Sequence, residues 1–94
     1  MPEDSRLAAI MFTDIVGYTA FMGSDEDKAF KTLRKNRNIQ SPLIKKYRGK
    51  WLKEMGDGIL ASFQSASDAE SCASEIQQAS KKEGVHLRIG INEG

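Results

Sequence analysis

The apolar run at residues 7–12 is the feature that most constrains this 94-residue chain. It contains β-branched and aromatic side chains and is long enough for a strand buried on both faces. The run stops at Thr13 and Asp14, and Gly17 follows three residues later. We therefore expect a strand that begins at residue 6 or 7 and ends near Thr13, after which the chain turns through Gly17 into a helix.

Such a turn predicts where charged groups meet. The acid is held by the rigid end of a sheet, and the next backbone N–H groups point outward at a helix N-terminus, which attracts anions. A carboxylate beside an anion site needs a cation between the two. The simplest interpretation is a divalent metal ion that carries a phosphate.

Length and composition exclude several classes of protein. Ninety-four residues allow one modest domain, and 14 Lys and Arg against 13 Asp and Glu give no electrostatic case for a nucleic-acid partner. The apolar runs are too short for a membrane segment, and we expect no signal peptide. Cys72 is the single cysteine, which excludes an internal disulfide and predicts a cytoplasmic protein.

The middle of the chain predicts a long helix. Residues 17–23 are expected to form a short helical turn, and Ser24 to cap a helix that runs to about residue 48. Pro42 predicts a kink or break near residues 39–41, and Gly49 ends the helix. The expected buried side chains of this helix are Ala29, Phe30, Leu33, Leu43, Ile44 and Tyr47.

The remaining elements follow from local signals. Residues 50–55 and 59–64 are extended segments around Gly56-Asp57-Gly58, a strong hairpin signal. The capping-box pattern at residues 67–70 opens a second helix, and residues 87–91 alternate as a last strand. The expected buried stripe of the second helix is Ala69, Cys72, Ala73, Ile76 and Ala79.

The order β-α-β-β-α-β predicts an α+β, ferredoxin-like sandwich in which a four-stranded antiparallel sheet carries two helices on one face. The first strand is apolar on both sides, yet the helices cover only one. The other face needs a further layer, from a partner subunit or from additional chain. We therefore predict self-association, most simply as a homodimer.

The same topology brings Asp14 near Asp57, because the first strand pairs beside the hairpin. Two like charges ~4 Å apart cost about 4 kcal/mol at an effective dielectric of about 20, so such a pair needs a cation or a raised pKa. Ligation by oxygen alone suits Mg²⁺ or Mn²⁺. Two simpler alternatives stay open at this point: Asp14 as a helix cap only, and Asp57 as a turn former only.

Two stretches carry a resemblance to a known family. Residues 12–19 (FTDIVGYT) resemble the first metal-binding motif of the class III nucleotidyl cyclases, the adenylate and guanylate cyclase catalytic domains. Residues 49–58 (GKWLKEMGDG) resemble their second motif, and the resemblance runs from about Arg6 to the end of the chain. It implies that residues 1–94 are a single domain, the N-terminal half of a cyclase catalytic domain.

The resemblance also implies roles for individual residues. Asp14 and Asp57 match the aspartates that hold two divalent ions, Mg²⁺ or Mn²⁺, with the backbone carbonyl of Ile15 as a further ligand. Lys53 matches the residue that reads the purine, where Lys implies ATP and Glu would imply GTP; an exposed strand lysine is the alternative. The turn that holds the triphosphate matches Val16, Gly17, Tyr18 and Thr19.

The implied reaction is attack of the ribose 3′ oxygen on the α-phosphorus of ATP, which gives cyclic AMP and pyrophosphate at a site between two subunits. The family's transition-state Asn and Arg are expected beyond Gly94, so we expect little turnover from these residues alone. The alternative is a catalytically silent cyclase-like module that dimerises or senses nucleotide. A diguanylate cyclase lacks support, because its Gly-Gly-Asp/Glu-Glu-Phe run does not occur.

Overall fold

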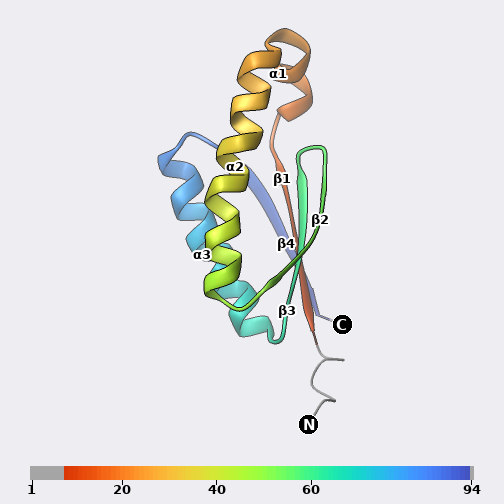
Figure 1. Ribbon diagram of the computed structural model, residues 1–94, viewed down its shortest axis with the longest axis vertical. Coiled ribbons are helices and arrows are strands. Elements are labelled where there is room, and N and C mark those ends of the chain that lie inside the picture. Colours follow the sequence, from red (N-terminus) through yellow and green to blue (C-terminus); the bar gives the residue numbers. More distant parts are fainter. Residues whose placement is uncertain (1–7, 94) are drawn as a thin grey trace.

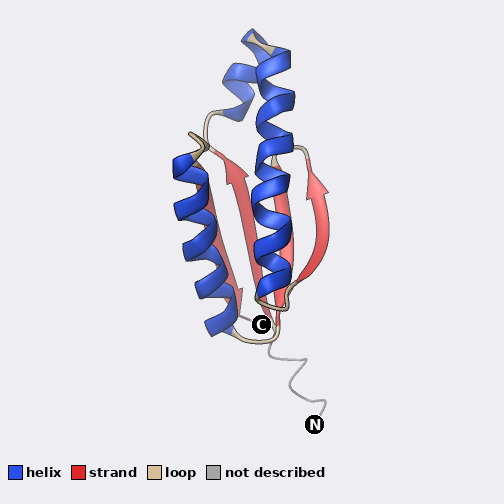
Figure 2. Ribbon diagram, turned by 60° about the vertical axis from the view of Figure 1, so that its left-hand side comes forward, coloured by secondary structure: helices blue, strands red, loops and turns tan. Residues whose placement is uncertain are grey.

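The computed structural model describes residues 8–93, except for the side chains of Thr19, Phe21 and Met22. Four antiparallel strands form one sheet in the order β2-β3-β1-β4, and α2 and α3 cover one of its faces (Figures 1 and 2). The predicted α+β, ferredoxin-like fold is confirmed. The elements are β1 (Ala9–Ile15), α1 (Tyr18–Ser24), α2 (Glu26–Lys46), β2 (Lys50–Met55), β3 (Gly58–Phe63), α3 (Ala66–Lys82) and β4 (Leu87–Glu93).

Strand β1 lies inside the sheet and has two different faces. Its buried residues alternate along the strand and face the helices: Ala9, Met11, Thr13 and Ile15. Phe12 lies on the opposite face, where 49% of it stays exposed although the residue belongs to an apolar run. The predicted uncovered sheet face is therefore present in the structure.

The end of β1 differs from the prediction. The strand continues to Ile15, two residues past the expected end, because β4 pairs with it as far as Ile15 opposite Leu87. Asp14 is thus held inside the sheet by neighbouring strands. The expected start of this strand, at residue 6 or 7, falls outside the described residues.

Helix α2 corrects three predictions. Its N-cap is Asp25, whose carboxylate accepts from the Lys28 amide at 3.0 Å, and not Ser24. The predicted break at Pro42 is absent, because the helix is buried on both sides of the proline, at Gln40 and Ile44, which offsets the ~3 kcal/mol cost of an internal proline. Phe30 is 57% exposed, because the first turns of α2 extend with α1 beyond the sheet (Figure 1).

Among the described residues, no helix is long and apolar enough to cross a bilayer.

Helix α3 begins earlier than expected. Its N-cap is Ser65, whose hydroxyl accepts from the Asp68 amide at 3.1 Å, so the capping box expected at residues 67–70 is wrong. The predicted stripe is buried at Ala69, Cys72 and Ile76. Ala73 and Ala79, which were also expected in the stripe, are only partly buried.

Two residues, Arg48 and Gly49, shape the C-terminal end of α2, although Gly49 alone was expected to end the helix. Arg48 adopts the left-handed conformation, with φ of 60°, in place of the glycine expected to end the helix. Gly49 is instead required by packing, because a Cβ there would lie 2.5 Å from the ring of Phe63 and 2.9 Å from a methyl group of Ile44. The turn into β2 therefore passes directly against the core.

These two positions predict opposite effects on stability. Gly49→Ala should lower the free energy of unfolding by about 1–3 kcal/mol, because the added methyl group overpacks the core at Phe63. Arg48→Gly should raise it by up to about 1 kcal/mol, because glycine adopts a positive φ without strain. Urea unfolding of the two variants checks both signs, and an equal effect at both positions would contradict the assignment.

Candidate metal and nucleotide site

Asp57 is held at the end of β1 by a backbone hydrogen bond. The amide of Ile15 donates to Asp57 Oδ2 at 3.0 Å, although 42 residues separate the two. The contact forms because β3 pairs with β1 and the turn before β3, with Gly56 at φ 58°, brings Asp57 back over the strand end. The structure therefore places Asp57 beside the strand that carries Asp14, as the topology predicted.

Asp14 is bound by an arginine of the other neighbouring strand. Arg88 of β4 lies directly opposite Asp14, and its Nε and Nη2 donate to the two carboxylate oxygens at 3.0 and 3.3 Å. The pKa of Arg88 is raised above its ordinary value, first by the hydrogen bond and charge of Asp14 and further by the charge of Asp57. One cationic group thus interacts with both acids.

Arg88 was missed by the sequence reasoning. Its signal is its place between Leu87 and Ile89 in an alternating strand, which puts it on the polar side. A guanidinium is also the planar fork that binds carboxylate or phosphate with two parallel hydrogen bonds.

The chemistry of the donor set fits a divalent cation. Asp14 and Asp57 offer the hard oxygen donors that such an ion prefers, and the positive charge of Arg88 already lies against Asp14. No group of three or more His, Cys, Asp or Glu that could hold a metal ion occurs among the described residues. Two carboxylates therefore need backbone, water or substrate oxygens to complete an ion's shell.

The predicted phosphate turn, residues 16–19, follows directly. The Val16 amide donates to the His86 carbonyl at 2.9 Å, so this amide belongs to the edge of the sheet. Gly17 has a φ of 76°, which lets the chain reverse into α1. The side chain of Tyr18 is buried in the core, whereas that of Thr19 lies outside the described part of the structure.

Lys53 is not brought together with the two carboxylates. It lies on β2, next to a register irregularity, and is separated from β1 by β3. Its register partner Leu60 is in turn opposite Phe12, so Lys53 stands in the same row as Phe12 across the sheet. Its side chain is exposed.

Comparison with known proteins places this geometry in a family. No protein-family model matches the chain. A curated protein of Rhizobium meliloti (strain 1021) named "Putative adenylate cyclase 3" is 36% identical over 98 residues, which span 95% of this chain and 17% of that protein. The adenylate/guanylate cyclase/hydrolase from Silicibacter pomeroyi is 36% identical, with a TM-score of 0.81 over 94% of this chain and 56% of that one. The chain belongs to the class III nucleotidyl cyclase domain family.

A further solved structure shares the fold of this cyclase domain. It is a dimeric guanylyl cyclase domain of the RhoGC fusion protein from Blastocladiella emersonii, at 22% identity and a TM-score of 0.80 over 93% of this chain and 57% of that one. The cyclase chain thus spans little more than half of these solved structures and a smaller part of the curated relative.

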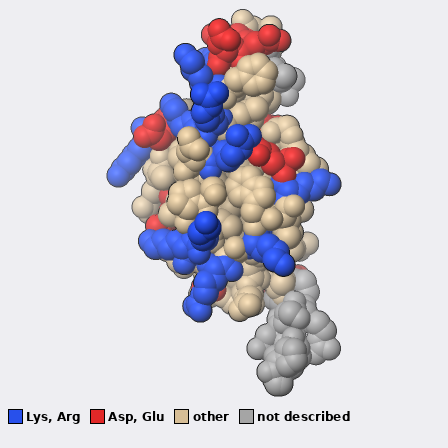
Figure 3. Space-filling model, viewed as in Figure 1, with Lys and Arg blue, Asp and Glu red and all other residues tan. Residues whose placement is uncertain are grey.

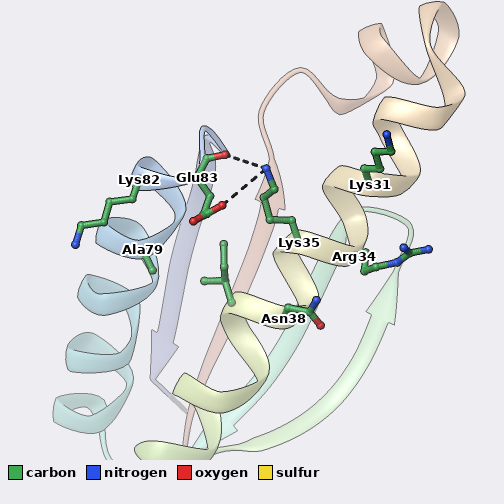
Figure 4. Close-up of a pocket in the computed structure, with 8 residues that line it drawn as sticks. Lys31, Arg34, Lys35, Asn38, Ala79, Lys82 and Glu83 are labelled. Atoms are coloured by element: carbon green, nitrogen blue, oxygen red, sulfur yellow. Dashed lines mark hydrogen bonds and ion pairs between the residues drawn. The ribbon is translucent and has the colours of Figure 1, made fainter.

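A hollow of about 610 Å³ in this cyclase chain lies between α2 and α3, on the helix-covered side (Figure 4). At its rim, Lys35 Nζ lies 3.4 Å from the Glu83 carbonyl and 3.9 Å from the Glu83 carboxylate. None of its lining residues is a predicted site residue. Lys and Arg side chains are spread over the face seen in Figure 3, without forming one compact patch.

The single cysteine and histidine take no part in the site. Cys72 is buried in α3, and burial raises the pKa of its thiol to about 12, so the reactive thiolate is suppressed. His86 is exposed and contacts the site only through its backbone carbonyl. This agrees with a reaction that needs no side-chain nucleophile.

Proposed function

We propose that this chain is the N-terminal half of an adenylate cyclase catalytic domain, which converts ATP to 3′,5′-cyclic AMP and pyrophosphate with two divalent ions, Mg²⁺ or Mn²⁺. The observation that carries the proposal is the hydrogen bond from Ile15 to Asp57, which sets a second carboxylate beside Asp14. The curated relative named as an adenylate cyclase supports the same reaction. The free buried cysteine fits a cytoplasmic site of action.

The residues have distinct roles in this proposal. Asp14, Asp57 and the Ile15 carbonyl would hold the ions, which when bound lower the pKa of the ribose hydroxyl and neutralise the triphosphate. Residues 17–19 of the predicted phosphate turn would hold the phosphates, since the Val16 amide already donates to the His86 carbonyl. The guanidinium of Arg88 would assist them, because its fork matches phosphate oxygens as well as it matches Asp14. Catalysis then depends on positioning and charge neutralisation.

Removal of either carboxylate charge tests the metal site. Asp14→Asn and Asp57→Asn, each made in the protein that contains this chain, should lower cyclic AMP formation from ATP and Mn²⁺ at least a hundredfold, because an amide cannot neutralise the ion. Asp27→Asn in α2, an exposed acid away from the site, is the matched control and should leave activity unchanged.

Calorimetric titration with Mn²⁺ should lose its heat in the same two variants. Full activity in Asp14→Asn would contradict the assignment. Metal and nucleotide binding without product in the unmodified protein would favour the silent cyclase-like module.

Lys53 tests the choice of purine. A Lys donor suits the N1 acceptor of adenine, whereas a carboxylate suits guanine, which carries donors there. Lys53→Glu should lower kcat/KM for ATP by about tenfold or more, because an acceptor then faces an acceptor. Lys50→Glu, on the same strand and also exposed, is the control for charge alone. Equal losses in both variants, measured as product formed from ATP and from GTP, would contradict a role of Lys53 in purine choice.

The uncovered sheet face supports a dimer. Phe12 and Met55 are both about half exposed on or beside it, so this face presents apolar side chains that a second subunit would cover. The RhoGC domain, which has the same fold, was solved as a non-canonical dimer. A homodimer would cover this face and could bring Lys53 of one subunit to the carboxylates of the other.

Variants of two phenylalanines with similar exposure distinguish a specific interface from non-specific hydrophobic association. Phe12→Ser should weaken self-association at least tenfold, because it removes apolar surface from the proposed interface. Phe30→Ser, in the extended part of α2, should leave it unchanged. Light scattering over a concentration series measures both variants. A wild-type protein that stays monomeric at the highest concentration would contradict the homodimer.

A further inference from the structure

Three buried polar side chains form a chain of hydrogen bonds between α2 and β1. Gln40 Nε2 donates to Thr13 Oγ1 at 3.0 Å and to Asn36 Oδ1 at 2.8 Å. All three side chains belong to residues that are almost completely buried. Burial of polar groups is costly unless they are bonded, and apolar side chains would fill the same space without that cost. The cluster therefore calls for a role other than filling the core.

Its position supplies that role. Thr13 directly precedes Asp14, and strand alternation places Thr13 toward the helices and Asp14 on the opposite face. The next residue, Ile15, donates its amide to Asp57. The Gln40–Thr13 bond thus fixes the peptide segment from which both candidate metal ligands are positioned.

We propose that Gln40 is a positioning residue, whose buried amide acts through Thr13 to fix the end of β1 and hence the placement of Asp14 relative to Asp57. The consequence for the metal rests on the proposed function, whereas the effect on the strand end does not. Gln40 touches neither carboxylate, so it acts only through Thr13 and the backbone.

The unused half of the Gln40 amide supports this role. Among the described residues, Gln40 Oε1 and Ser80 Oγ are the buried side-chain oxygens or nitrogens without a hydrogen-bond partner. Gln40 therefore keeps a buried unbonded oxygen while both its donors are directed to named acceptors. A buried oxygen without a hydrogen-bond partner costs free energy. We infer that the two hydrogen bonds donated by the Gln40 amide outweigh this cost and account for a glutamine at this position.

The test uses variants that keep shape and remove one contact. Thr13→Val removes the hydroxyl, Thr13→Ser keeps it, and Gln40→Met removes the amide. Ser80→Ala is the matched control, because it removes a buried polar group of α3 that has no partner. The first readout is hydrogen exchange of the Ile15 amide, measured by NMR without metal and relative to the Ala61 amide of β3, which corrects for global stability.

Thr13→Val and Gln40→Met should speed Ile15 exchange about tenfold relative to Ala61, while Thr13→Ser and Ser80→Ala should match the wild type. The second readout is the Mn²⁺ dissociation constant, which should rise about tenfold in the first two variants only. An unchanged exchange ratio in both would overturn the proposal. Altered Ile15 exchange in a protein whose wild type binds no Mn²⁺ would uphold the positioning role and reject the metal site.

Discussion

The hydrogen bond from the Ile15 amide to Asp57 joins the β1 end to the hairpin turn, and the site depends on it. At the end of β1 the hairpin has already turned away, so this amide needs an acceptor other than a strand carbonyl. The carboxylate of Asp57 takes that place, and its position is therefore set by the backbone. Arg88 reaches Asp14 from the other neighbouring strand. The β2–β3 turn, β1 and β4 thus each contribute one charged group to one end of the sheet.

The two faces of β1 divide packing from chemistry. The Thr13 hydroxyl accepts a hydrogen bond from Gln40 of α2, while Asp14, one residue later, faces away from the helices. Farther along this second face, the ring of Phe12 lies over Gly90, where any side chain on β4 would collide with it. Gly90 and the Phe12 ring packed over it together form a flat apolar surface on the same face as Asp14. A surface of that kind is suited to contact another protein layer, which explains why apolar residues and the candidate site share one face.

The sequence predicted correctly those features that depend on interactions between residues close together in the chain. The hairpin at Asp57 and the alternation of β4 depend on neighbouring residues, and with the strand order they were enough to bring Asp57 to β1. Arg88 could not be assigned, because its partner is 74 residues away and depends on the β1–β4 register. Adjacent Ser and Asp residues compete as helix caps, so Asp25 could not be chosen over Ser24 from sequence. The exposure of Phe30 depends on where the sheet ends beneath α2, which periodicity does not show.

The ion pair of Arg88 with Asp14 lies at the surface of the sheet end and is not part of its core. The Arg88 guanidinium donates to both carboxylate oxygens of Asp14, and the charge of Asp57 also helps to raise the pKa of Arg88. The side chain of Arg88 is 75% exposed, and exposed ion pairs add little to stability, so the fold would lose little without this pair. The sheet, its core and the Ile15–Asp57 bond do not depend on this ion pair. The backbone that positions Asp14 and Asp57 is therefore held independently of what the Asp14 carboxylate binds.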